Sequence, residues 1–270
     1  MAAVAHVSPF HFHRLFKAVV GETLAQFVKR RRLERALYLL SHTPGRSLTD
    51  VALQCGFSSS SDFSRSFKQY FGVPPSAFDL EAFRQSRRGE FELTMQPAPA
   101  ESTRFFLPPD ENPDGFEARL RDLPARTVAY IRVFDPNRIG VVQAACERLM
   151  AWADDRGFGT GEWLGYMWDE PEIVALKDCR YDAAVVVDGA FKPEGEIGRF
   201  DFPPMRVVEV VVRGDLSLEA RAIDWIYRTW LPGSGYVPDD QPAFEAWIGR
   251  PYAHGDQYFE ISCQLPVRRA

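Results

Sequence analysis

The first third of the 270-residue chain contains an internal repeat whose two copies lie 51 residues apart. Identical residues in this register, without a gap, include Phe12 and Phe63, Arg14 and Arg65, Phe16 and Phe67, Lys17 and Lys68, Gly21 and Gly72, and Phe27 and Phe78. So many identities at one offset indicate a duplicated structural unit. The N-terminal part of the chain is therefore constrained to fold as two similar units.

Each copy of the repeat is typical of an amphipathic helix that ends at a glycine. In the first copy Ser8 and Pro9 provide an N-cap and a proline at the first helical position, and Gly21 stands where a C-cap is expected. Apolar residues recur at helical spacing along one face: Phe12, Leu15, Phe16 and Val19. At ~100° per residue, the opposite face carries Phe10, His13, Arg14 and Lys17 in the first copy and Ser61, Ser64, Arg65 and Lys68 in the second.

A second short helix is predicted just before the second copy. Ser47 to Asp50 resembles a capping box that opens a helix over residues 50–55, and Gly56-Phe57 closes it. A short helix, a turn with glycine and a longer helix with a basic outer face form a helix-turn-helix. Residues 23–41 predict one long helix between the copies. Its basic run at 29–32 is typical of a solvated face, or it contacts phosphate beside the two units.

Two stretches resemble the DNA-binding domain of AraC/XylS-type transcription regulators: "VSPFHFHRLFKAVVGETLAQFVKRRRLERALYLL" and "SLTDVALQCGFSSSSDFSRSFKQYFGVPPSAF". The resemblance implies an all-α tandem helix-turn-helix domain over residues 1–83, with double-stranded DNA as partner and RNA polymerase left open as a further one. It implies that these residues face bases or phosphates: Phe10, His13, Arg14, Lys17, Ser60, Ser61, Ser64, Arg65 and Lys68. The alternative is that Arg14 and Arg65 are ordinary surface charges.

One departure from this family concerns the start of the chain. Shifting the second copy back by 51 residues places the equivalents of Ser47 to Asp50 before Met1, so the first unit lacks its opening helix. We expect either a start upstream of Met1 or an incomplete first unit. An incomplete unit would leave Phe12, Phe16 and Phe27 poorly covered.

The distribution of charge divides the chain into two blocks. Residues 1–90 carry 13 basic and 7 acidic residues, and the remainder carries 19 and 30, so a basic block precedes an acidic one. A basic block favours a polyanionic partner.

Four scattered cysteines without a Cys-x-x-Cys pair suit a reducing cytoplasm. The sequence contains no run of about 18 apolar residues, so we expect no membrane partner.

Residues 84–114 are rich in Pro, Glu and Asp and predict a linker with no packed core of its own. From 115 onward, strands and helices alternate: a strand at 126–134, a helix at 138–157, strands near 163–168 and 182–188, then a strand at 205–213, a helix at 217–230 and strands at 242–248 and 257–266. This order is β-α-β-β twice over, which predicts an α+β domain with antiparallel pairing.

Residues 116–267 resemble the GyrI-like effector-binding domain, which is also found in Rob-like and BmrR-like regulators. The stretches that carry the resemblance are "LPARTVAYIRV", "GYMWDEPEIVALKDCRYDAAVVV", "QPAFEAWIGRP" and "ISCQLPV". The resemblance implies a domain over 115–270 with a cleft between its two β-α-β-β halves. That cleft would bind a small aromatic or cationic molecule, and a glutamate on the strand at 242–248 would lie in it.

Glu245 matches this glutamate. If it faces inward, desolvation raises its pKa, and a cationic ligand supplies the missing counter-charge. The aromatic candidates beside it are Trp163, Tyr166, Trp168 and Trp247. Because side chains alternate along a strand, Glu245 and Trp247 share a face, and only some of the others join them. The alternatives are a solvent-facing Glu245 and aromatic residues that only pack in the core.

Taken together, these patterns predict a ligand-responsive, sequence-specific DNA-binding transcription regulator. We expect no enzymatic activity, no catalytic residue and no cofactor. We also expect no metal site, because His11 and His13 on one helix point ~200° apart. The alternative function is a small-molecule hydrolase or a ligand-sequestering protein that acts through the C-terminal domain.

Overall fold

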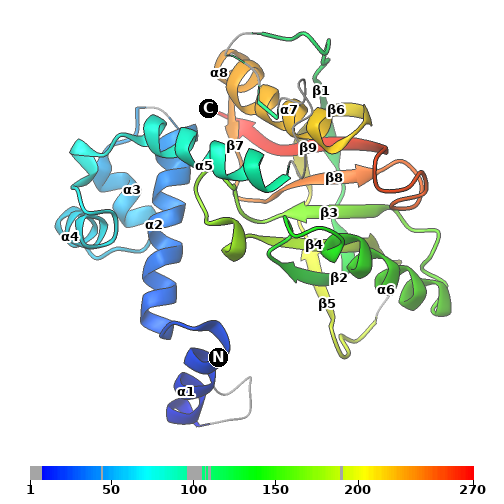
Figure 1. Cartoon of the computed structure of the whole chain (residues 1–270), viewed down its shortest axis with the longest axis horizontal. Coiled ribbons are helices and arrows are strands. Elements are labelled where there is room, and N and C mark those ends of the chain that lie inside the picture. Colours follow the sequence, from blue (N-terminus) through cyan, green and yellow to red (C-terminus); the bar gives the residue numbers. More distant parts are fainter. Residues whose placement is uncertain (1–7, 44, 96–104, 107, 109–110, 189–190) are drawn as a thin grey trace. The chain divides into compact units, whose positions relative to one another are not determined.

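The computed structural model describes residues 8–43, 45–95, 105–106, 108, 111–188 and 191–270 (Figure 1). The chain divides into two compact units, which comprise residues 1–83 and 84–270. None of the described helices is both long enough and apolar enough to cross a membrane.

The N-terminal unit consists of helices. They are α1 (Pro9–Val20), α2 (Leu24–His42), α3 (Leu48–Gln54), α4 (Ser60–Phe71) and a single 3₁₀ turn (Pro75–Ala77), and the unit ends within α5 (Leu80–Met95). The duplicated sequence becomes a duplicated helix, since α1 and α4 begin and end 51 residues apart. Both end at a left-handed glycine, Gly21 with φ of 82° and Gly72 with φ of 83°, whose N–H donates to a lysine carbonyl at 2.9 Å.

The two copies differ in how well their apolar faces are buried. Phe63 and Phe67 of α4 are fully buried, because α3 packs against α4 and the ring of Phe57 lies 5.3 Å from that of Phe63. Their counterparts Phe12 and Phe16 on α1 are only half-buried, and no residue of α1 is fully buried. Among the described residues, no helix covers α1 as α3 covers α4.

Residues 84–95 differ from the prediction of a linker without a packed core. They form the larger part of α5, and Arg88 in this helix is only 8% exposed. The burial depends on acidic residues far away in the sequence, which local composition could not reveal. Part of the remaining predicted linker, including 96–104, lies outside the described residues.

The described part of the C-terminal unit is built on a nine-stranded antiparallel sheet, in the order β1-β6-β9-β8-β3-β4-β2-β5, with β7 paired to β9. Its strands are β1 (Arg119–Leu123), β2 (Arg126–Phe134), β3 (Trp163–Met167), β4 (Arg180–Val186), β5 (Ile197–Phe202), β6 (Met205–Gly214), β7 (Tyr236–Pro238), β8 (Ala243–Trp247) and β9 (Phe259–Arg269). The predicted β-α-β-β order is present twice, as β2-α6-β3-β4 and β6-α7-β8-β9, so the fold class is confirmed. The sequence analysis missed β1, β5 and β7. β1 and β5 are the edge strands of the sheet, and the three-residue β7 pairs only with the end of β9; none of the three has a clear apolar alternation.

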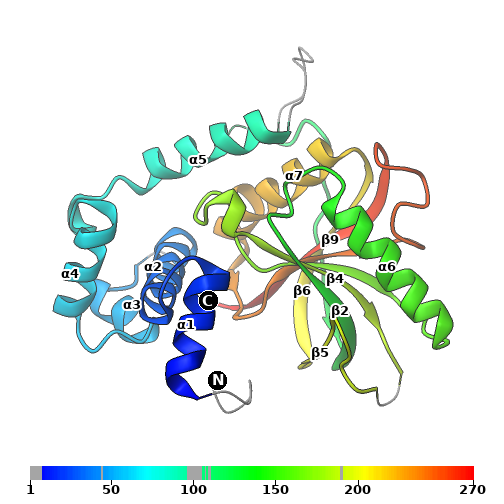
Figure 2. The same cartoon turned by 60° about the horizontal axis from the view of Figure 1, so that its bottom comes forward.

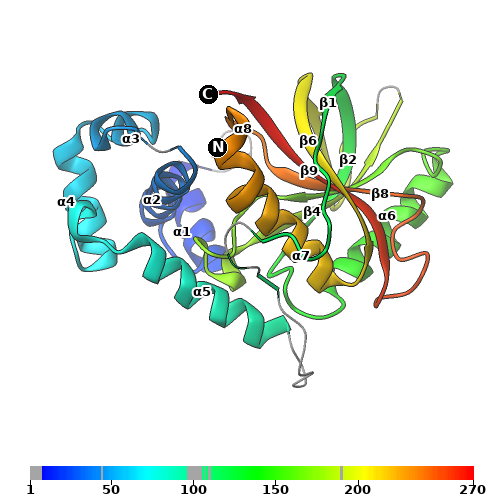
Figure 3. The ribbon, with the colours of Figure 1, turned by 90° about the horizontal axis from the view of Figure 1, so that it is seen from above.

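The helices α6 (Val141–Asp155), α7 (Leu216–Trp225) and α8 (Leu231–Ser234) complete this unit, with a π-helical segment (Ile226–Trp230) between the last two. α6 packs on β2 and β4, and α7 packs on β6 and β9. Both lie on the same face of the sheet, which Figures 2 and 3 show from two sides. The opposite face has an apolar cluster of its own, which includes Leu164, Tyr166 and Phe244.

Candidate functional site

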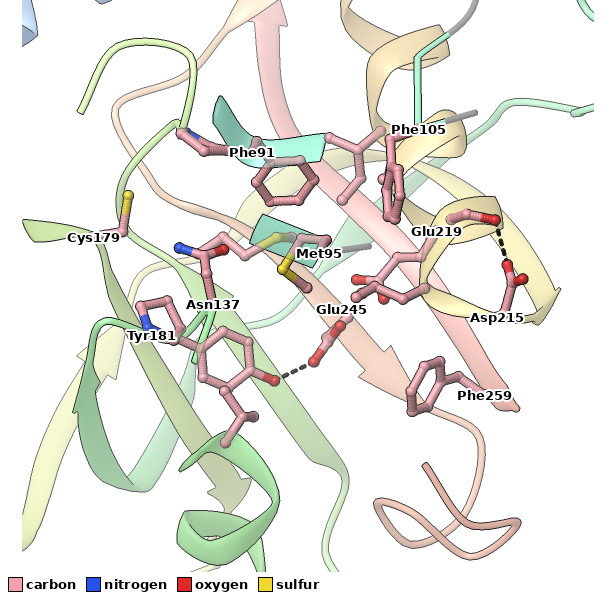
Figure 4. A pocket seen from close by; sticks show the side chains of 18 of the residues that line it. Phe91, Met95, Phe105, Asn137, Cys179, Tyr181, Asp215, Glu219, Glu245 and Phe259 are labelled. Atoms are coloured by element: carbon pink, nitrogen blue, oxygen red, sulfur yellow. Dashed lines mark hydrogen bonds between the residues drawn. The ribbon is translucent and has the colours of Figure 1, made fainter. Parts of the chain in front are cut away.

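A cavity of about 670 Å³ opens on the helix-bearing face of the sheet in the C-terminal unit (Figure 4). Aromatic side chains make up much of its wall: Phe91, Phe105, Phe106, Tyr181, Tyr227, Trp247, Tyr252 and Phe259. Arg84, Phe91 and Met95 come from α5, and Phe105 and Phe106 follow this helix. The other lining residues come from α6, α7, the π-helical segment, the sheet and its loops. A space of this volume with aromatic walls accommodates a molecule of the size of a drug.

Glu245 brings a carboxyl group into this apolar cavity. It stands in the middle of β8 and is 5% exposed, and the Tyr181 hydroxyl on β4 donates a hydrogen bond to its Oε1 (Figure 4). Burial raises the pKa of Glu245 above its ordinary value, although the hydrogen bonds that it accepts act in the opposite direction. The carboxyl group of Glu245 therefore has one neutral donor fixed beside it and little water.

Glu219 on α7 adds a second carboxyl group to the same cavity. It is 7% exposed and lines the cavity together with Glu245. Burial raises the pKa of Glu219 well above its ordinary value, and the charge of Glu245 raises it further. Among the residues described, neither Glu219 nor Glu245 forms an ion pair.

Gly165 on β3 provides the space in which these groups meet. It is the direct cross-strand partner of Glu245. A β-carbon at position 165 would lie 2.5 Å from Cζ of Tyr181, and closer still to the Tyr181 hydroxyl and the Glu245 carboxylate. The hydrogen bond between Tyr181 and Glu245 therefore requires glycine at this point of the central strand.

The other predicted ligand-binding residues are distributed over both faces of the sheet. Trp247 lines the cavity beside Glu245, and Trp163 shares its face but packs in the core and does not line the cavity. Tyr166 and Trp168 lie on the opposite face, because side chains alternate along β3. Tyr166 stacks on Phe202, and Trp168 donates its indole N–H to Asp182 at 2.6 Å.

Sequence reasoning did not single out several residues that line the cavity: Glu219, Tyr181, Phe91, Met95, Phe105 and Phe106. A signal for Glu219 existed, since this carboxylate stands three residues before Ala222 and seven before Ile226, on the apolar face of a helix. Phe91, Met95, Phe105 and Phe106 lie within the predicted linker, where the sequence does not show which residues an apolar side chain contacts.

Two arginines hold α5 in place beside the cavity. Arg84 pairs with Glu170 and Glu172, and Arg88 pairs with Glu172 at 2.6 Å and with Asp224 at 3.3 Å. All five side chains are at least four-fifths buried, which makes these pairs less screened than surface ion pairs. The network therefore fixes Phe91 and Met95, on the same helix, as part of the cavity wall.

The predicted DNA-contacting residues all lie on α1 and α4. On α4, Ser61, Arg65 and Lys68 are exposed, and Ser60 and Ser64 are half-buried. On α1 the predicted residues, Phe10, His13, Arg14 and Lys17, are all exposed. In the basic run at 29–32, Arg30 instead pairs with Glu22 and Glu34 within the unit.

We expect the substitution Glu219→Gln to stabilise the C-terminal unit at high pH and not at low pH. A carboxyl group with a raised folded-state pKa binds its proton more tightly when folded, so its contribution is complete at acidic pH and is lost as the pH rises. The amide cannot ionise, and we expect a gain of about 1–2 kcal/mol at pH 8 that vanishes near pH 4. Urea unfolding followed by tryptophan fluorescence at both pH values measures it.

The exposed carboxylate Asp256, which lines the same cavity, supplies the control for this measurement. Asp256→Asn should leave the free energy of unfolding unchanged at both pH values. An equal effect of both substitutions, or a loss of stability in Glu219→Gln at pH 8, would contradict the prediction that Glu219 holds a proton in the folded protein.

Comparison with known proteins separates the same two regions. Residues 1–80 match a helix-turn-helix domain model of the AraC type, and residues 116–268 match the GyrI-like small molecule binding domain. The HTH-type transcriptional regulator YbfP of Bacillus subtilis is 40% identical over 75 residues, which are 28% of this chain and 25% of the relative. A DNA gyrase inhibitor of Serratia proteamaculans is 29% identical over 162 residues, which are 56% of this chain and 97% of the relative.

The probable transcriptional regulator LumQ of Photobacterium leiognathi is 37% identical over 80 residues, which are 30% of this chain and 32% of the relative. The chain thus spans about a quarter of the length of YbfP and about a third of the length of LumQ. Among solved structures, the cryo-EM structure of an EcmrR–DNA complex covers 100% of this chain and 98% of its own, with 12% identity and a TM-score of 0.46.

The fold and the cavity define a helix-turn-helix domain followed by a small-molecule-binding domain. The family model matches more than half of the chain, and the chain belongs to the GyrI-like small molecule binding domain family. The resemblance to an AraC-type regulator with a GyrI-like domain is thereby confirmed.

Proposed function

We propose that this protein is a sequence-specific DNA-binding transcription regulator whose activity is controlled by a small cationic or aromatic molecule in the C-terminal cavity. The observation that carries this proposal is the cavity itself, in which Glu219 and Glu245 lie among aromatic rings without a cationic partner in the described structure. A ligand with a positive charge and aromatic groups complements both features. The same chain carries helices typical of DNA recognition.

The proposed DNA contacts come mainly from α4. Its exposed face presents Arg65, which can hydrogen-bond a guanine edge, and Lys68, which suits a phosphate. Ser61 and Ser64 on the same face read bases less selectively. The test is a titration with the DNA upstream of the protein's own gene, at two salt concentrations and with unrelated DNA as competitor. Retention of the upstream fragment over the competitor supports the regulator.

We expect different effects from substitution of the two basic residues on α4. Arg65→Ala should weaken binding to the preferred DNA by about 1–3 kcal/mol and relax its sequence preference. Lys68→Ala should weaken binding to all DNA alike and lower the salt dependence by about one phosphate contact. Filter binding or fluorescence anisotropy over a salt series measures both effects.

Arg119→Ala is the matched control, because Arg119 is an exposed arginine on β1 in the C-terminal unit. It should change neither the preference nor the salt dependence. If Arg65→Ala behaved like Arg119→Ala, the assignment of α4 as the recognition helix would be wrong.

Helix α5 is the element through which we propose that the ligand acts. Phe91 and Met95 line the cavity, and the first residues of the same helix, Leu80 to Phe83, belong to the N-terminal unit. A ligand that displaces these side chains acts on a helix that the two units share. For this coupling to work, the ligand must bind two arrangements of the helix with different affinity.

Two further assignments follow from a regulator of this kind. We propose that it acts in the cytoplasm, where DNA is available and where its four buried cysteines stay reduced. We also propose that it is not an enzyme.

The alternative is a hydrolase, which one observation favours: Tyr181 and Glu245 form a hydrogen-bonded pair that could serve as acid and base. A protein that retains no DNA but consumes or sequesters a cavity ligand would establish one of the alternatives.

A further inference from the structure

We infer that Glu219 and Glu245 share a proton in the ligand-free protein, and that a cationic ligand enters the cavity in exchange for it. This inference rests on the proposed function, because it concerns the same cavity and the same class of ligand. It goes further in assigning a role to Glu219 and in making ligand binding dependent on pH.

The first observation is that two carboxyl groups, one from α7 and one from β8, are buried in the same cavity. Burial of two negative charges without a counter-charge is unfavourable, so one of the two groups carries a proton. Tyr181 donates its hydroxyl proton to Glu245. Because this hydrogen bond favours the ionised form of Glu245, Glu219 is the group that holds the proton.

The second observation is that no cation balances the pair among the described residues. Four other acidic residues of the cavity wall do have such partners: Arg180 pairs with Asp169, Arg84 with Glu170 and Glu172, and Arg88 with Glu172 and Asp224. Arg138 also lines the cavity, but it lies exposed in the loop before α6. The proton is therefore the positive charge that compensates the pair in the empty cavity.

The remaining titratable groups around the pair stay neutral. Burial raises the pKa of the Cys146 thiol on α6 to about 12, and it also raises the pKa of Tyr181 on β4, Cys263 on β9 and Tyr252 in the loop after β8. None of these groups ionises near neutral pH, so none competes with the pair for the proton or for a cation. Proton release on ligand binding can then be assigned to Glu219 and Glu245.

A cation beside Glu245 takes over the electrostatic role of the proton. Its charge favours the ionised form of both carboxyl groups, so the proton leaves to the buffer as the cation binds. For an exchange of one proton per cation, the affinity rises about tenfold for each unit of pH. A neutral molecule of the same shape releases no proton and binds equally well at each pH.

Glu219→Gln is the variant that isolates the shared proton. The amide keeps the shape of the side chain, but it cannot release a proton. We expect this variant to bind a cation with no proton release and with little change in affinity from pH 6 to pH 8. Asp155→Asn, at an exposed carboxylate at the end of α6 that does not line the cavity, should behave like the unsubstituted protein.

Calorimetric titration of the full chain with methyltriphenylphosphonium, in buffers of different ionisation enthalpy, measures the number of protons released. Triphenylphosphine oxide is the neutral probe. We expect about one proton per phosphonium ion for the unsubstituted protein and Asp155→Asn, and none for Glu219→Gln. Phosphonium binding without proton release, or equal release with the neutral probe, would overturn the exchange.

Infrared spectra of the ligand-free protein test the shared proton without any ligand. At pH 7 the unsubstituted protein and Asp155→Asn should show the carbonyl band of a protonated carboxyl group, and Glu219→Gln should lack it. Absence of the band from the unsubstituted protein would overturn the inference. If the band is present and neither probe binds, the shared proton is supported, and the exchange is overturned together with the proposed class of ligand.

Discussion

Phe63→Ala will destabilise the N-terminal unit by about 3–5 kcal/mol, while Phe12→Ala, at the equivalent place in the repeat, will cost about 1 kcal/mol or less. Phe63 is fully buried between Phe57 and Phe67, with ring centroids 5.3 Å and 5.5 Å away, so its removal leaves a cavity. Phe12 is only half-buried, and water can fill the space that its ring leaves. The same chemical change thus has different costs at two positions of one repeat.

Unfolding in urea, followed by two signals, separates this effect from the rest of the chain. All six tryptophans lie between residues 152 and 247, so their fluorescence reports on the C-terminal unit alone. Far-ultraviolet circular dichroism reports on the helices of both units. Phe63→Ala should shift the dichroism transition and leave the fluorescence transition in place. Equal losses for Phe63→Ala and Phe12→Ala would mean that α1 is as well covered as α4.

Gly165→Ala will destabilise the C-terminal unit by about 2–4 kcal/mol and disrupt the cavity. The added methyl group would overlap the Tyr181 hydroxyl and the Glu245 carboxylate, and both side chains are buried. At least one of them must rotate away, which breaks their hydrogen bond and leaves a buried polar group without its partner. We therefore expect an earlier fluorescence transition in urea and the loss of phosphonium binding.

Gly89→Ala is the matched control for this substitution. Gly89 lies within α5, and a β-carbon there would meet no atom within 4 Å. Because glycine is a poor helix former, alanine should stabilise the chain by up to about 1 kcal/mol, with ligand binding unchanged. If Gly165→Ala were as mild as Gly89→Ala, Tyr181 and Glu245 could not be packed against β3 as described.

Features of the fold that depend on near neighbours could be predicted from the sequence. The offset of 51 residues predicted two similar helices, and Ser8, Ser59, Gly21 and Gly72 cap them as local chemistry requires. The bounds of β2 agree with the predicted strand at 126–134, because its apolar residues and flanking turn are continuous in the chain. The alternation along β8 also placed Glu245 and Trp247 on one face.

The sequence by itself determined two helical repeats, two β-α-β-β units, and a glutamate in a strand with aromatic neighbours. Only the tertiary structure decided which face of β3 meets that glutamate, because alternation separates Trp163 from Tyr166 without telling which one faces α6 and α7. Likewise, only folding brings Glu219, 26 residues before Glu245, and Tyr181, 64 residues before it, to the same carboxyl group. Contacts between distant segments depend on how strands pair and helices pack, and no local pattern of residues records them.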